Sequence, residues 1–216
     1  MVRCHAVQQQ TDTISGLCGV VLIVDPATEM QVRRLAGQSA NMSVRTELPH
    51  LSLYHVDLDE VPRRAVTTVL QSIRDVVRNT PIRLEELAVF GDRFVFWDAA
   101  VTLELRAAHE AALELAPFRR VDGGKSSAAG IGLDLTPEQI ANDRDFGYVF
   151  VKRLFRPHVT IGYYDHAVEA PEVAQPALRE AGVAAVALYE LGNHGRIVTP
   201  IEQLPVFDRA PGRGAA

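Results

Sequence analysis

The sequence predicts a globular protein of the α+β class. Segments with the two-residue period or the continuous apolar run that is typical of strands occur along the whole chain, and segments with helical spacing lie between several of them. The composition agrees, because 216 residues, of which 47% are hydrophobic and 23% charged, can bury a sizeable core. We therefore expect helices on one face of antiparallel or mixed β-sheets.

The expected elements follow one another from the N-terminus. The apolar run at 17–24 predicts a buried strand, and Pro26 suits the first turn of a helix that continues over 27–40. Alternating apolar residues at 49–58 predict a second strand, and helical spacing at 60–78 predicts a second helix. The remaining predicted elements are strands at 82–90, 92–98, 149–154, 158–164, 183–191 and 196–206, a helix at 100–116, and a helix capped by Thr136 with Pro137 in its first turn.

Charge and cysteine content narrow the class of protein. The net charge of −5 argues against binding of long duplex nucleic acid, which requires a basic face, although a short nucleotide can still bind. Cys4 and Cys18 form neither a CxxC motif nor a disulfide framework, which is typical of the reducing cytoplasm. The N-terminal residues are polar and the longest apolar run is too short to span a bilayer. We expect a cytoplasmic monomer with no membrane partner.

One short motif occurs twice in the chain. The segments at 49–53 and 157–161 both read Pro-His-apolar-hydroxyl-apolar, and both lie in predicted strands. In a strand, residues i and i+2 point to the same face, about 6–7 Å apart, so each histidine projects together with its hydroxyl residue. The four side chains are His50, Ser52, His158 and Thr160.

Several neighbours of the motifs are further candidates for substrate contacts. Regular alternation places Tyr54 and Tyr164 on the face of the motif histidines, and Tyr163 lies beside them. Arg156 shares the parity of His158, so its guanidinium is a candidate for phosphate contact. The same alternation points His55 away from His50 and predicts a structural role for it.

Two facing imidazoles suit the in-line opening of a phosphodiester. One histidine can accept the proton of the attacking oxygen and the other can protonate the leaving oxygen, because the ordinary pKa of histidine lies near neutral pH. The two hydroxyls can donate to the non-bridging oxygens. Two other interpretations stay open: a non-catalytic module that binds a nucleotide or an RNA end, and a metal-dependent hydrolase that uses His50, His158 and nearby aspartates.

The paired motifs resemble those of the two-histidine (2H) phosphoesterase superfamily, which includes the bacterial 2′,5′-RNA ligase and cyclic phosphodiesterase proteins. The apolar first strand and the closing strand pair around Gly195 also resemble that family. The resemblance implies a single bilobal domain over 1–216, with two antiparallel or mixed sheets flanking a central cleft and helices on the outer faces. We expect flexible tails at 1–14 and 209–216, and the segment 121–149 looks like a lid or a specificity insertion.

The resemblance also implies roles for the motif residues. His50 and His158 would be the acid and base, and Ser52 and Thr160 would bind phosphate. The implied substrates are cyclic (2′,3′-type) or 2′-linked phosphodiesters of a small nucleotide or an RNA end, with no metal and no cofactor required.

Overall fold

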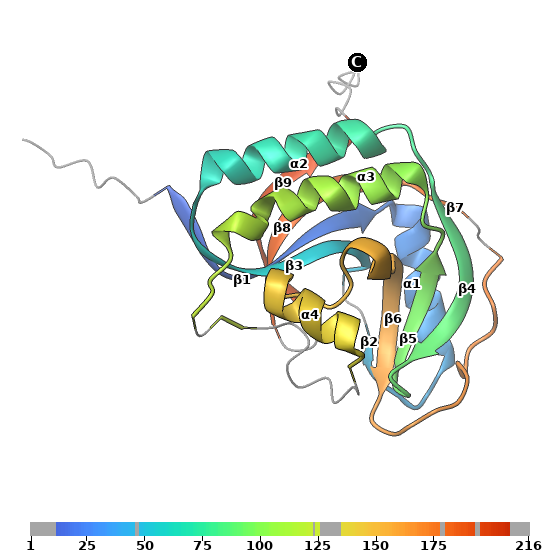
Figure 1. The fold of residues 1–216 in the computed structure, drawn as a ribbon. Helices are drawn as coiled ribbons and strands as arrows, with labels where there is room; N and C mark the ends of the chain where they lie inside the picture. The colour runs from blue at the N-terminus through green and yellow to red at the C-terminus, as the bar shows by residue number, and fades with distance from the viewer. Residues whose placement is uncertain are drawn as a thin grey trace, which may run out of the picture.

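The computed structural model describes residues 12–45, 48–122, 124–125, 135–177, 180–192 and 195–207. Figure 1 shows the arrangement of its helices and strands. In chain order they are β1 (Thr13–Val24), α1 (Pro26–Gln38), β2 (Met42–Arg45), β3 (His50–Pro62), α2 (Arg63–Val77), β4 (Ile82–Phe90), β5 (Phe94–Ala99), α3 (Leu103–Ala112), the 3-10 helix η1 (Leu113–Phe118), α4 (Pro137–Phe146), the 3-10 helix η2 (Lys152–Leu154), β6 (His158–Tyr164), β7 (Glu180–Ala181), β8 (Val183–Leu191) and β9 (Ile197–Pro205).

The described strands form one antiparallel sheet with the order β7-β4-β5-β6-β3-β1-β8-β9, and β2 pairs with β6. The predicted α+β class is confirmed, but one sheet stands where two were predicted. We call β1, β3, β8 and β9 the first half of the sheet, and the remaining strands the second half. A single residue pair, Leu51 with Val159, joins the halves. In Figure 1, β1 and β3 run across the view whereas β5 and β6 run down it, so the two halves take different directions.

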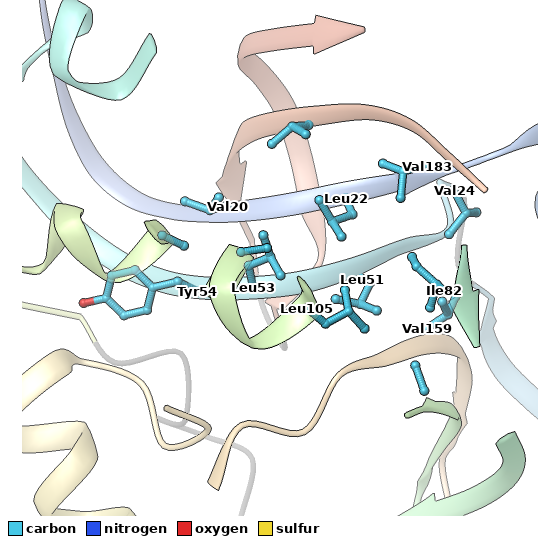
Figure 2. Packing of buried hydrophobic residues seen from close by; sticks show 14 of the residues in the cluster. Val20, Leu22, Val24, Leu51, Leu53, Tyr54, Ile82, Leu105, Val159 and Val183 are labelled. Atoms are coloured by element: carbon cyan, nitrogen blue, oxygen red, sulfur yellow. The ribbon is translucent and has the colours of Figure 1, made fainter. Parts of the chain in front are cut away.

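Three helices cover one face of the sheet. The residues of α2 that are buried recur at helical spacing, and α2 contacts both β8 and β9. Helix α3 packs beside α2 and over β3, and α1 contacts β6. Figure 2 shows Leu51 of β3 close to Leu105 of α3, with Leu22 of β1 nearby. All three helices bury apolar side chains in this same core, which continues under both halves of the sheet.

Most predicted elements are present, and the differences have local causes. Strand β1 begins at Thr13, so the last residues of the predicted tail at 1–14 belong to the sheet. The helix predicted from Thr136 is confirmed, with a capping box between Thr136 and Gln139. The tail at 209–216 lies outside the described residues, as does much of the Gly/Ser-rich part of 121–149.

The strand predicted at 149–154 is wrong. The Asn142 side-chain amide of α4 donates to the carbonyls of Val149 and Val151, at 3.1 and 3.4 Å, where a strand would have bonded to a neighbouring strand. Lys152 then takes a φ of 55° and starts η2. Strands β2 and β7 were not predicted. In the described part of the chain, no helix is long and apolar enough to cross a membrane.

Candidate active site

The two motifs meet where the halves of the sheet join. Leu51 and Val159 are paired there, and both are fully buried on the face that the helices cover. Because side chains alternate along a strand, the residues on either side of this pair lie on the opposite face, which we call the site face. These four residues are His50, Ser52, His158 and Thr160.

Antiparallel register arranges the four side chains as a quadrilateral. Around the joining pair, His50 of β3 lies beside Thr160 of β6, and Ser52 lies beside His158. The two histidines are therefore diagonal neighbours, for which the usual separation is about 7–8 Å. A group bound between them would contact one imidazole on each side and one hydroxyl from each strand.

Both motif histidines make the same hydrogen bond to the backbone. Nδ1 of His50 lies 2.8 Å from the carbonyl oxygen of Leu48, and Nδ1 of His158 lies 2.8 Å from the carbonyl oxygen of Arg156. A carbonyl oxygen can only accept, so Nδ1 carries the proton in each neutral ring. Each Nε2 is thereby left as the atom that can accept or deliver a proton on the site face.

Burial makes both imidazoles poor at holding a charge. Each side chain is 9% exposed. Burial lowers the pKa of His50, although its bond to Leu48 opposes this. Burial lowers the pKa of His158 to about 4, with the nearby Arg156 guanidinium and His50 adding to the effect and Asp98 opposing it. Both rings are thus neutral in the ligand-free protein near pH 7.

Both motif strands carry a β-bulge at the same motif position. On β3 the extra residue is Leu53, because consecutive residues of β1 pair with the residues on either side of it. On β6 the extra residue is Ile161, for the same reason relative to β5. Each is the third residue after the motif histidine, and each is buried in the core. A bulge shifts the alternation by one residue, so every later side chain on the strand changes face.

The bulges correct two of the predicted substrate contacts. Regular alternation placed Tyr54 and Tyr164 on the site face, but both are fully buried in the core. The Tyr54 hydroxyl donates to the carbonyl of Phe146 at the end of α4, at 2.6 Å, and the Tyr164 hydroxyl accepts from the Glu172 backbone N–H at 3.2 Å. Because of the bulge at Ile161, Tyr163 is instead the tyrosine that lies on the face of His158, and it is half-buried.

The same shift brings a third histidine to the site. His55 was predicted to point away from His50, yet its Nε2 lies 3.0 Å from the Ser52 hydroxyl. Burial, together with smaller contributions from the neighbouring His50 and His158, lowers the pKa of His55 to about 3. No sequence signal distinguishes this residue, because the bulge that turns it leaves no Gly or Pro at Leu53.

Aromatic rings line the site beside the second half of the sheet, and their contacts extend to the first half. Phe96 of β5 stacks on His158 with ring centroids 3.7 Å apart. Tyr148, which follows α4, lies 4.4 Å from the ring of His55. A continuous series of ring contacts connects His158 to His55. It passes through Phe96, Phe90, Phe150 and Tyr148. The end of the predicted insertion at 121–149 therefore contributes a ring to the site.

Arg156 lies beside the site but is held by another group. Its guanidinium donates to both carboxylate oxygens of Asp98, at 2.9 and 3.2 Å, and lies over the rings of Phe90 and Phe96. Asp98 pairs with His158 across β5 and β6. A phosphate contact by Arg156 stays a prediction, in which the remaining N–H groups of the guanidinium would be used.

His109 of α3 was not predicted to have a partner, and it proves to support the site. Its Nε2 accepts from the backbone N–H of Lys152, so Nδ1 carries the proton that is donated to the carbonyl of Leu53. The ring thus links α3, the bulge of β3 and the segment before the second motif. Within the described ranges, no group of three His, Cys, Asp or Glu residues is arranged to hold a metal ion.

Comparisons with known proteins identify a family and similar folds. The family described as the 2′-5′ RNA ligase superfamily matches residues 24–193. The fold is similar to TT0787 of Thermus thermophilus (TM-score 0.54, 17% identity, covering 88% of this chain and 97% of that one). It is also similar to E. coli LigT complexed with NADP+ (TM-score 0.50, 13% identity, 88% and 97% covered). No curated protein matches the chain.

Proposed function

Because the chain belongs to the 2′-5′ RNA ligase superfamily, as its resemblance to the 2H phosphoesterases predicted, we propose that it is a phosphodiesterase that needs no metal. Membership indicates phosphoesterase or RNA-ligase-like chemistry. We propose cyclic 2′,3′-type or 2′-linked phosphodiesters of a small nucleotide or an RNA end as substrates. The observation that carries the proposal is the shared Nδ1 bond of His50 and His158, which leaves two Nε2 atoms for proton transfer.

The proposed reaction uses one imidazole as base and the other as acid. Nε2 of the neutral histidine takes the proton of a water, or of a 5′-hydroxyl in the ligation direction, as that oxygen bonds to phosphorus. The bond from phosphorus to the 2′ or 3′ oxygen breaks, and the imidazolium gives its proton to this leaving oxygen. The hydroxyls of Ser52 and Thr160 would donate to the non-bridging oxygens, where negative charge increases. The orientation of the bound substrate decides which histidine is the base.

The low pKa values of the histidines fit an anionic substrate. Burial disfavours the imidazolium in the free site, but a bound phosphodiester carries a negative charge that favours it. Substrate binding would therefore raise the pKa of the histidine that acts as acid. The rings that line the second half offer faces on which a nucleobase can stack, which supports a nucleotide substrate.

A panel of phosphodiesters tests the proposal. The purified protein is incubated with 2′,3′-cyclic nucleotides, 3′,5′-cyclic nucleotides and 2′,5′-linked dinucleotides, with and without EDTA, beside the His50→Ala/His158→Ala double variant. We expect turnover of the cyclic 2′,3′ or 2′-linked compounds by the native protein alone. Tight binding without turnover would instead indicate a binding module, and loss of turnover in EDTA would indicate a metal-dependent hydrolase.

A further inference from the structure

His55 is a third imidazole at the site, but its hydrogen bonds differ from those of the two motif histidines. It is 7% exposed, and it packs against the ring of Tyr148 and the backbone of Gly195. Its Nε2 lies 3.0 Å from the Ser52 hydroxyl oxygen. Its Nδ1 is buried and has no hydrogen-bond partner among the described residues.

These contacts distinguish the two neutral forms of the ring. If Nδ1 carried the proton, a buried N–H would have no acceptor, and such orphaned N–H groups are rarer than orphaned acceptors. Nε2 would then be bare and would accept the single proton of the Ser52 hydroxyl. If Nε2 carries the proton, Ser52 Oγ accepts it, and the unpartnered atom is a bare nitrogen.

We propose that His55 is a positioning residue that donates through Nε2–H to Ser52 Oγ, so that the Ser52 hydroxyl proton is directed to a phosphate oxygen. The inference rests on the proposed function for the identity of the bound anion. A hydroxyl has one proton, and Ser52 can give it to a ligand only when its other neighbour is a donor. The bulge at Leu53 makes this contact possible, because it turns His55 to the site face. At the matching position after Thr160, the second half has Tyr163.

The tautomers can be measured without any ligand. Long-range ¹H–¹⁵N spectra of the histidine rings at pH 7 distinguish a protonated from a bare ring nitrogen. We expect the proton on Nε2 in His55 and on Nδ1 in both His50 and His158. A His55 ring protonated on Nδ1 would overturn the inference whether or not the protein hydrolyses a phosphodiester.

Variants then test the coupling between His55 and Ser52. Binding of inorganic phosphate is measured for His55→Leu and His55→Gln, each with Ser52 intact and with Ser52→Ala. We expect His55→Leu to weaken binding about tenfold only when Ser52 is present, as is typical of one hydrogen bond to a charged group. His55→Gln should recover most of the affinity, because its amide N–H can donate to Ser52.

The outcomes separate this inference from a structural role and from the proposed function. An equal loss in both Ser52 backgrounds, or no loss in either, would contradict the inference. If His55→Leu does not fold, the tautomer measurement on the native protein decides. Coupling in phosphate binding with no turnover on the substrate panel would refute the proposed function and leave the inference intact.

Discussion

The two halves of the sheet carry the same motif in different surroundings. Each has a histidine whose Nδ1 donates to the carbonyl two residues earlier, followed by a hydroxyl residue and then by a bulge. Beside the first motif, the site face of β1 and β8 carries a small cluster, the aliphatic cluster, in which Tyr189 is the one ring among Val21, Ile23, Ala185 and Ala187. Beside the second motif, Phe96 and Phe94 of β5 take the corresponding places.

This difference separates what is shared from what is specific. The features that repeat are backbone features of a single strand: the carbonyl acceptor, the alternation and the bulge. The features that differ are side chains supplied by neighbouring strands and by the segment after α4. We infer that the repeated features determine the chemistry at phosphorus. The aliphatic and aromatic surroundings would then determine which side of the substrate lies on which half.

The largest expected effect is a loss of activity that is the same size whichever motif histidine is replaced. Replacement of either His50 or His158 by alanine should lower kcat by about 10²–10⁴-fold, because each removes one proton transfer. The exposed His166→Ala variant should retain full activity. Measurement uses the best compound of the substrate panel. A large loss for one histidine and a small loss for the other would show that the halves are not chemically equivalent.

Acid should destabilise the fold. The first half of the sheet should contribute more than the second, because His50 and His55 lie on β3 whereas only His158 lies on β6. Four buried histidines have a lowered pKa, namely His50, His55, His109 and His158. A folded pKa below the unfolded value of 6.5 means that the unfolded chain binds more protons below pH 6.5, so the stabilising contribution is present above that pH and is lost as pH falls. Each ring that stays neutral adds a slope of about 1.4 kcal/mol per pH unit. The window extends to about pH 4 for His158 and to about pH 3 for His55.

His109 offers the cleanest test of this dependence. Glutamine can donate to the Leu53 carbonyl and accept from the Lys152 N–H, as the neutral ring does, but it does not titrate. In denaturant unfolding at pH 7.5 to 4.5, His109→Gln should flatten the decline by the contribution of one proton. His166→Gln, on the exposed surface, is the control. An unchanged slope in His109→Gln would mean that the ring titrates normally.

The sequence predicted which side chains share the site face, and the bulges set the limit of that prediction. Alternation over three residues is a local property, so the placement of Ser52 beside His50 followed from spacing alone. The third residue after each histidine is an ordinary apolar residue, Leu53 or Ile161. Neither residue type indicates a bulge. The predictions that extended regular alternation beyond that residue, those for Tyr54, Tyr164 and His55, therefore had the wrong face.

Long-range contacts set the other limit. The single-sheet arrangement depends on one residue pair 108 positions apart, Leu51 with Val159, which no local pattern could reveal. The strand-like residues at 149–151 instead bond to the side chain of Asn142, whose polar amide replaces a neighbouring strand. By contrast, the start of α4 was predictable, because capping by Thr136 involves residues three positions apart.

A substitution in each half tests whether the aromatic side holds the nucleobase. Tyr163→Leu should raise KM for a 2′,3′-cyclic nucleotide about fivefold or more, since stacking of a base on an aromatic ring contributes about 1–3 kcal/mol. The matched change in the first half, Tyr189→Leu, should leave KM within about twofold, because that ring packs in the aliphatic cluster. The reverse result would place the base on the first half.

The smallest expected effect distinguishes core tyrosines from site tyrosines. Tyr54→Phe removes the donor to the Phe146 carbonyl, so the free energy of unfolding should fall by about 0.5–1.5 kcal/mol while kcat/KM stays within about twofold. Tyr164→Phe removes the longer bond to the Glu172 N–H and should cost less. Urea unfolding and steady-state kinetics measure both. A tenfold loss of kcat/KM in Tyr54→Phe with unchanged stability would put this hydroxyl at the substrate and contradict the bulge of β3, because only regular alternation would bring it to the site face.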